Sequence, residues 1–176
     1  MRSKVPPPQY RQARRQTRQG FHKCGKRADC CVCPCSSITI THTCNHTGVS
    51  YPIKVALSFN TAGVIYSVTC NKQSGLCGQL KGPQYIGYTS RAGKTRFNEY
   101  LGSATQHCQR DTCKPVGVHF REAGHSHSDM VFLLFEKVQS NDKFVPEARE
   151  SFWIKHYHSV KTKQVNQIEH GLNLSD

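Results

Sequence analysis

The first part of the chain carries a cluster of cysteines whose spacing suits a metal. Ten of the 176 residues are cysteines, and the segment CGKRADCCVCPC (24–35) holds five of them. The first twenty residues carry Arg and Pro where a secretory leader carries an apolar run, so we expect an intracellular chain with reduced thiols. Cys30 and Cys33 have the spacing of zinc knuckles. We therefore expect Zn²⁺ here, with reactive free thiols as the alternative. The candidate ligands are Cys24, Cys30, Cys33 and Cys35, with His42, Cys44 and His46 as further possibilities.

Positive charge is concentrated in the N-terminal part. The formal net charge is +13. Before residue 99 there are 15 Lys and Arg against one acid, Asp29, whereas from Glu99 onward there are 9 against 10. This asymmetry is typical of proteins that bind nucleic-acid phosphates; a merely soluble basic protein is the alternative. We expect residues 1–22 to form a disordered basic arm that contacts DNA. The arm's candidate contacts are Arg11, Arg14, Arg15 and Arg18.

Composition predicts one compact domain with an N-terminal extension. We expect the arm at 1–22, a Cys-rich, zinc-binding linker at 23–61 and the compact domain at 62–176. Only 36% of the residues are hydrophobic, so a second core is not expected. No apolar run reaches the roughly 18 residues that a membrane span needs, and no membrane partner is expected.

Hydrophobic patterning predicts an α/β sandwich in which helices flank a three-stranded antiparallel sheet. The continuous apolar run at 130–138 is typical of a central strand. Pro146, Glu147 and Glu150 suit the start of a helix. The segment 115–120 fits either a short helix or a strand, and 36–43 alternates as a strand does, with Ile38 and Ile40 on one side. The expected strands are 64–70, 84–89 and 130–138, and the expected helices are 94–101 and about 145–160.

Five polar residues fall on these elements where they could act together. Tyr66 lies on the first strand of the domain, Tyr85 on the second, Arg96 on the first helix, Glu150 on the last helix and Asn173 near the end. Each has an ordinary explanation by itself. Tyrosine is common in half-buried strands, and glutamate early in a helix favours the helix dipole.

In order along the chain, the segments that hold these residues resemble the GIY-YIG nuclease family. The matching segments are VIYSV, QYIGYTSR, RFNEY, ARESFWI and GLN, which span residues 63–174. The chain is most similar to the endonuclease domain of Penelope-like retroelements. That similarity depends on the insert from Cys70–Asn71 to Cys77, on PVGVHF with the GHS and SDM segments that follow it (115–130), and on RESFWI (149–154).

The resemblance implies a role for each residue in phosphodiester hydrolysis. Glu150 would bind one divalent cation, Mg²⁺ or Mn²⁺, which would neutralise charge on the phosphate and the leaving oxygen. Arg96 would hold the phosphate. Tyr66 would act as general base or orient the water, with its pKa lowered by Arg96 and the metal. Tyr85 would hydrogen-bond within the site, and Asn173 would brace the loop beside Glu150. Tyr100 occupies a position where many family members carry histidine, and Lys94 is a further nucleic-acid contact.

The resemblance also implies a structural zinc site in the domain. Its ligands would be Cys70, Cys77, His119 and His125, which would tie the hairpin of the two tyrosine strands to the connection before the third strand. The alternative is a core Cys70, a surface Cys77 and surface histidines.

Together these features predict a nuclear, metal-dependent DNA endonuclease that nicks one strand per active site during retroelement insertion. A reverse transcriptase module of the parent element would be a partner, and the oligomeric state is left open. One alternative is a zinc-stabilised nucleic-acid-binding module without activity, and another is a structure-selective repair nuclease. A zinc scaffold for protein partners is the third.

Overall fold

The structure is a computed structural model. It describes residues 19–24, 30–73, 75, 77, 82–105, 115–121, 124–142, 144–157, 159 and 173. Most of the expected basic arm, including Arg11, Arg14, Arg15 and Arg18, lies outside the described residues.

A three-stranded antiparallel sheet forms the centre of the fold, as predicted. Its strands are β5 (Val64–Cys70), β6 (Gln84–Thr89) and β7 (Met130–Lys137), in the order β6-β5-β7. The central strand is β5 and not β7, although β7 has the longer apolar run. Six of the seven residues of β5 are buried, because the strand has a neighbour on both edges and side chains packed on both faces.

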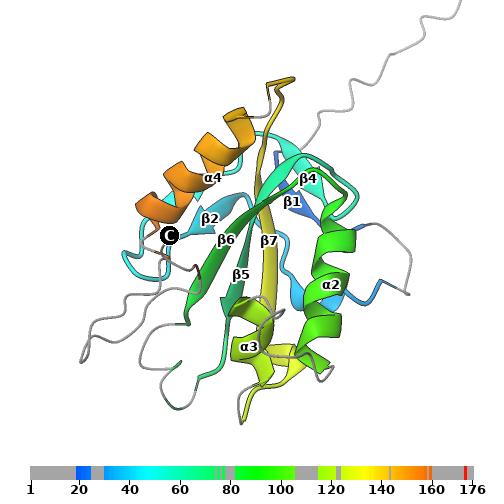
Figure 1. Cartoon of the computed structure of the whole chain (residues 1–176), viewed down its shortest axis with the longest axis vertical. Coiled ribbons are helices and arrows are strands. Elements are labelled where there is room, and N and C mark those ends of the chain that lie inside the picture. The colour runs from blue at the N-terminus through cyan, green and yellow to red at the C-terminus, as the bar shows by residue number, and fades with distance from the viewer. Residues whose placement is uncertain are drawn as a thin grey trace, which may run out of the picture.

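Three helices are described: α2 (Gly93–Thr105), α3 (Pro115–Arg121) and α4 (Phe144–His156). The strands of the sheet lie between α4 on one side and α2 on the other (Figure 1). The carboxylate of Asp142 accepts a hydrogen bond from the backbone N–H of Phe144 at 2.9 Å, which satisfies an N–H at the start of α4 that has no partner within the helix. None of the helices in the described part of the chain has the length and apolar character needed to cross a membrane.

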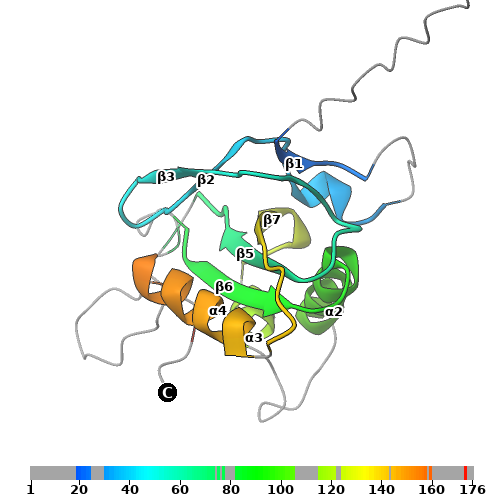
Figure 2. The ribbon, with the colours of Figure 1, turned by 90° about the horizontal axis from the view of Figure 1, so that it is seen from above.

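Residues before the domain pack against β7 and belong to the same core. β1 (Gly20–His22) pairs in parallel with β4 (Ala56–Ser58), and β2 (Thr41–Thr43) pairs with β3 (Ser50–Pro52). Figure 2 shows these strands across the sheet from β6. One continuous core joins Phe21 and Phe59 from this layer to Phe97 of α2. The boundary expected between residues 61 and 62 therefore falls inside a continuous core.

The strand expected at 36–43 is shorter than its alternation suggests. Only Thr41–Thr43 form β2, whereas Ile38 and Ile40 are 65% and 67% exposed. Cys33–Cys35 form a short 3-10 helix, η1, and a second one, η3, covers His127–Asp129.

His42 of β2 joins the N-terminal layer to the sheet and to α4. Its Nδ1 lies 2.6 Å from the hydroxyl of Tyr157, its Nε2 lies 3.0 Å from Oγ of Ser67, and its ring stacks on Phe135 at 3.9 Å. Burial lowers the pKa of His42 to about 3, so the ring is neutral. Both ring nitrogens have hydrogen-bond partners. This histidine is a satisfied core residue and not a metal ligand.

Candidate active site and metal centres

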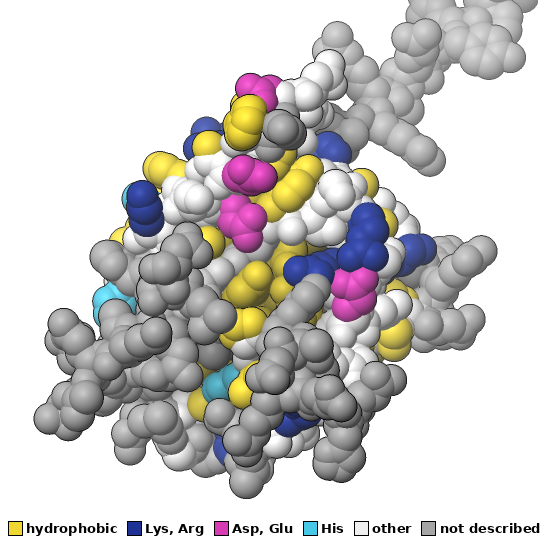
Figure 3. All heavy atoms as spheres, in the orientation of Figure 1, with side chains coloured by type: hydrophobic (Ala, Val, Ile, Leu, Met, Phe, Trp, Pro, Cys, Tyr) yellow, Lys and Arg dark blue, Asp and Glu magenta, His cyan; other side chains and the backbone are white. Residues whose placement is uncertain are grey.

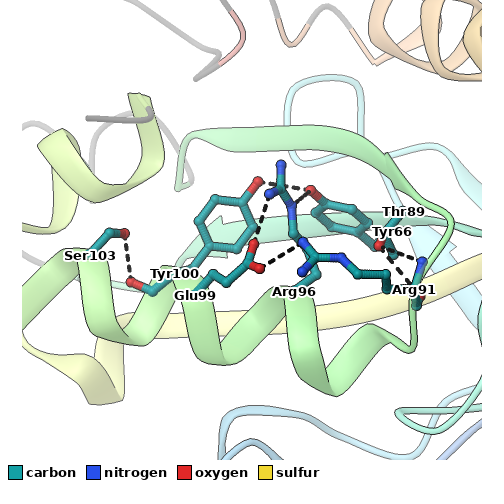
Figure 4. Close-up of polar contacts among 7 residues, drawn as sticks. All are labelled: Tyr66, Thr89, Arg91, Arg96, Glu99, Tyr100 and Ser103. Atoms are coloured by element: carbon teal, nitrogen blue, oxygen red, sulfur yellow. Dashed lines mark hydrogen bonds and ion pairs between the residues drawn. The ribbon is translucent and has the colours of Figure 1, made fainter. Parts of the chain in front are cut away.

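Tyr66, Arg96 and Tyr100 form a hydrogen-bonded group where α2 packs against β5 (Figure 4). Nε of Arg96 donates a hydrogen bond to the hydroxyl of Tyr66 at 3.0 Å, and that hydroxyl lies 2.8 Å from the hydroxyl of Tyr100. The guanidinium carbon of Arg96 lies 5.1 Å from the centre of the Tyr100 ring, a cation–π contact. One turn of α2 separates Arg96 from Tyr100, so both side chains point to the same side of the helix.

A glycine on β6 makes room for this group. Gly87 is paired with Tyr66 across the sheet. A Cβ atom at Gly87 would lie 2.6 Å from the Tyr66 hydroxyl and 2.8 Å from the Tyr85 ring. Gly87 thus allows two tyrosines on neighbouring strands to lie close together, with ring centres 6.2 Å apart.

The hydroxyls of Tyr66 and Tyr100 are deeply buried and stay protonated in the protein alone. The two residues are 0% and 1% exposed. Burial raises the pKa of Tyr66 and outweighs the lowering effect of Arg96. Burial also raises the pKa of Tyr100. Arg96 does lower the pKa of Tyr66, as expected, but the net shift in the protein alone is upward, because the desolvation cost of a phenolate exceeds the attraction of a single guanidinium.

Arg96 is further held by Glu99, which also pairs with Arg91. Nη1 of Arg96 lies 3.0 Å from one carboxylate oxygen of Glu99, and Arg91 lies 2.6 Å from the other. Although partial burial opposes the effect, these two cations lower the pKa of Glu99. Sequence reasoning missed Glu99, but its three-residue spacing from Arg96 on a predicted helix could have identified the pair.

Glu150, on α4, acts on the same site through its charge. Burial raises the pKa of its carboxyl, whereas a hydrogen bond from the backbone N–H of Tyr88 and the charge of Arg96 lower it. Its charge also acts on Tyr85, whose pKa is raised chiefly by burial. Glu150, Arg96 and Tyr85 are thus close enough to influence one another, although they come from three different elements.

The face of the molecule above this group has charges of opposite sign on either side. Figure 3 shows acidic side chains over α4 and Lys and Arg side chains near the start of α2, with hydrophobic side chains between them. Lys94 is exposed in the first turn of α2.

Asn173 binds the outer edge of β6. Its Oδ1 accepts a hydrogen bond from the backbone N–H of Ile86 at 2.9 Å, and its Nδ2 donates to the carbonyl of Ile86 at 2.8 Å. The backbone N–H of Asn173 donates to the carbonyl of Ser159. The side chain therefore supports the strand between Tyr85 and Gly87, and not a loop beside Glu150.

The four residues of the expected zinc site lie together. One ligand atom from each of Cys70, Cys77, His119 and His125 falls within 4.8 Å of all the others. Sγ of Cys77 lies 3.7 Å from Nε2 of His119 and 3.3 Å from Nε2 of His125. Tetrahedral zinc with ordinary bond lengths places sulfur and nitrogen ligands about 3.6 Å apart. The arrangement fits a metal ion.

Gly82 lies against the backbone of Cys70 and is hydrogen-bonded to Cys77. Gly82 has a φ of +77°, and a Cβ at this position would lie 2.0 Å from the carbonyl oxygen of Cys70. The backbone N–H of Gly82 donates to the carbonyl of Cys77 at 2.9 Å, and that of Cys70 donates to the carbonyl of Pro83 at 3.1 Å. Glycine is needed here because it alone combines positive φ with so close a backbone contact.

Three of the four cysteines expected at the N-terminal site also lie together. The sulfur atoms of Cys24, Cys30 and Cys33 fall within 4.8 Å of one another. Cys35 is not in this group and points to the carbonyl of Cys31 at 4.0 Å. The group could hold a metal ion with three thiolates. Cys31 instead lies 3.2 Å from Oδ1 of Asn98 on α2.

Comparisons with models of protein families, with curated proteins and with solved structures find no match for this chain. Membership of a nuclease family therefore stays a prediction from the residues.

Proposed function

We propose that the protein is a metal-dependent DNA endonuclease of the GIY-YIG type, with the corresponding fold. The observation that carries the proposal is the packing of Arg96 and Tyr85 around Tyr66, at a site on which the charge of Glu150 acts. A half-buried carboxylate beside an arginine and a phenol supplies a cation ligand, a phosphate ligand and a hydrogen-bond donor. The basic N-terminal half of the chain supports a nucleic-acid substrate.

In this proposal, Glu150 holds Mg²⁺ or Mn²⁺. A single carboxylate suits such an ion, which takes its remaining ligands from phosphate and water. The ion would stabilise negative charge on the phosphate and the leaving oxygen. Burial of Glu150 fits this role, since a half-desolvated carboxylate gains more from a bound cation than an exposed one.

The chain's own residues position the phosphate. The guanidinium of Arg96 would bind the phosphate oxygens, and its side chain is oriented by Tyr66 from below and by Glu99 at the side. Tyr85, which is partly exposed, would hydrogen-bond to the phosphate or to the attacking water. Tyr66 and Tyr100 are then positioning residues, because their hydroxyls are buried beneath Arg96.

The test is nicking of supercoiled plasmid by the full chain with added Mg²⁺ or Mn²⁺. We expect the wild type to produce open circles and Glu150→Gln to lose at least a hundredfold in rate, as for a removed metal ligand. Glu147→Gln is the matched control, since Glu147 is an exposed carboxylate on the same helix. Nicking by Glu150→Gln at the wild-type rate would overturn the metal assignment.

The raised pKa of Tyr66 favours a second candidate, a zinc-stabilised nucleic-acid-binding module. A protein of this kind would bind plasmid DNA in a gel-shift assay without nicking it under either metal. Cleavage of branched DNA much faster than plain duplex would instead indicate a structure-selective nuclease. A role in retroelement insertion predicts cleavage of ordinary duplex DNA.

A further inference from the structure

A cavity of about 620 Å³ lies on another side of α4, between that helix, β7 and residues 51–55. Its volume is within the range of roughly 300–1,000 Å³ that is usual for ligand sites. Glu150 is not among its lining residues. The cavity is therefore separate from the candidate active site, and an inference from it does not depend on nuclease activity.

Aromatic rings in fixed orientations form one wall of the cavity. Phe152 is 44% exposed, and its ring is nearly parallel to that of His156, with centres 5.2 Å apart and an interplanar angle of 15°. The hydroxyl of Tyr51 lies 2.6 Å from Nε2 of His156 and so fixes the histidine ring. The rings of Tyr51 and Trp153 also pack edge to face, with centres 5.4 Å apart.

The acidic group in the cavity is already neutralised. Glu136 accepts two hydrogen bonds from Arg149, each of 2.7 Å, and a third from Nε1 of Trp153 at 2.6 Å. The Arg149 guanidinium in turn lies over the Phe152 ring at 4.7 Å. Apart from the paired Glu136 and Arg149, the charged residues that line the cavity are Lys54 and Lys137, and both are positive. Lys155 adds a further cation in the adjoining groove beside Phe152 and His156.

We propose that this cavity binds an unpaired base of single-stranded nucleic acid. An exposed aromatic wall bordered by cations is the arrangement by which proteins stack single-stranded bases and hold the neighbouring phosphates. A base inside a duplex is stacked between its neighbours and cannot enter. The base would pack against the exposed parts of the Phe152 and His156 rings, and the flanking phosphates would lie near Lys54 and Lys155.

Trp153 provides a reporter that is specific to this cavity. It is the one tryptophan of the 176-residue chain, and it lines the cavity. The experiment titrates the full chain with a 12-mer of oligo(dT), without added Mg²⁺ or Mn²⁺, and follows tryptophan fluorescence. We expect saturable quenching by oligo(dT) and little quenching by a blunt duplex of the same length. A parallel titration with oligo(U) distinguishes DNA from RNA.

Substitutions test the contact with the base. We expect Phe152→Ala to weaken the binding seen by quenching at least about fivefold, the usual effect of removing one stacking ring. Phe152→Leu, which keeps apolar bulk, should weaken it similarly and guards against loss of folding. Phe144→Ala is the matched control, because Phe144 is exposed on the same helix and does not line the cavity. Lys54→Ala should reduce the salt dependence of binding by about one phosphate contact.

Three results would overturn the proposal: oligo(dT) that binds by fluorescence anisotropy without quenching Trp153, equal quenching by duplex, or unchanged binding by both Phe152 variants. Glu150→Gln separates this proposal from the nuclease assignment. We expect that variant to bind oligo(dT) as the wild type does, whether or not it has lost nicking.

Discussion

The hydroxyl of Tyr66 accepts a hydrogen bond from Nε of Arg96 at 3.0 Å, although the two residues lie on different elements, β5 and α2. This contact directs Nε of Arg96 toward the buried Tyr66 hydroxyl. The other guanidinium nitrogens can then bind partners at the surface, as Nη1 binds Glu99. The strand tyrosine therefore orients the arginine that the proposed mechanism places on the phosphate.

Replacing Tyr66 with Phe should lower the nicking rate more than DNA binding. The change removes the acceptor for Arg96 and the partner of the Tyr100 hydroxyl, so the guanidinium is less well oriented. We expect a 10- to 100-fold lower kcat with little change in KM, and a loss of about 1–3 kcal/mol in the free energy of unfolding from the unpaired buried groups. Tyr88→Phe, on the neighbouring strand, serves as the control. Equal effects of the two substitutions on kcat would contradict the positioning role of Tyr66.

Gly87→Ala should destabilise the fold, because the new Cβ would lie 2.6 Å from the Tyr66 hydroxyl. We expect a loss of about 1–3 kcal/mol, as for overpacking in a core, measured by urea unfolding. Gly102→Ala in α2 is the matched control, since a Cβ there has no atom within 4 Å; it should stabilise the helix by up to about 1 kcal/mol. A neutral Gly87→Ala would mean that the two tyrosines are not closely packed.

Cys77→Ser should remove one bound zinc and lower the thermal midpoint of unfolding. The four ligands come from distant parts of the chain, so a metal ion would hold those parts together, and its loss should cost more than about 2 kcal/mol. Zinc content by elemental analysis and the thiolate-to-cobalt absorption of Co²⁺-substituted protein are the measurements. Cys31→Ser is the control, because Cys31 belongs to neither cluster. Equal zinc content in Cys77→Ser and wild type would contradict the assignment.

Stability should fall with acid because of His42. Burial lowers the pKa of this ring from 6.5 to about 3, so between these values the unfolded chain binds a proton that the folded chain does not. The free energy of unfolding should therefore decrease by up to about 1.4 kcal/mol per pH unit as the pH falls through this window. Urea unfolding from pH 7 to pH 4 measures the slope. His42→Gln should be less stable at pH 7 but show a shallower slope, and an unchanged slope would assign the effect to other groups.

The central sheet and its flanking helices were predictable because their apolar periodicity is strong. β7 is a continuous hydrophobic run, and β5 and β6 are short runs rich in β-branched and aromatic residues, bounded by turn residues. The N-terminal layer was harder to predict, because β1 to β4 have three residues each and pair through contacts distant in sequence. The buried role of His42 depends on Tyr157, 115 residues away, and no local pattern reveals such a partner.

The residues of the candidate site could be predicted from the sequence, but their burial and protonation could not. The ordered motifs named Tyr66, Tyr85, Arg96 and Glu150; Tyr66 contacts Arg96 and Tyr85, and the charge of Glu150 acts on Tyr85. Their solvent access could not be predicted, because it depends on how α2 covers β5. Burial is the main reason that Tyr66 stays protonated. The spacing of residues along the chain does not reveal how deeply a strand tyrosine is buried.

The pairing of Asn173 with Ile86 also protects the fold from self-association. β6 is the terminal strand of its sheet, and its outward N–H and carbonyl groups would otherwise offer a template for a strand of another molecule. One amide side chain occupies both groups of Ile86. A chain shortened before this asparagine would leave them open, and edge-to-edge aggregation would then compete with the native sheet.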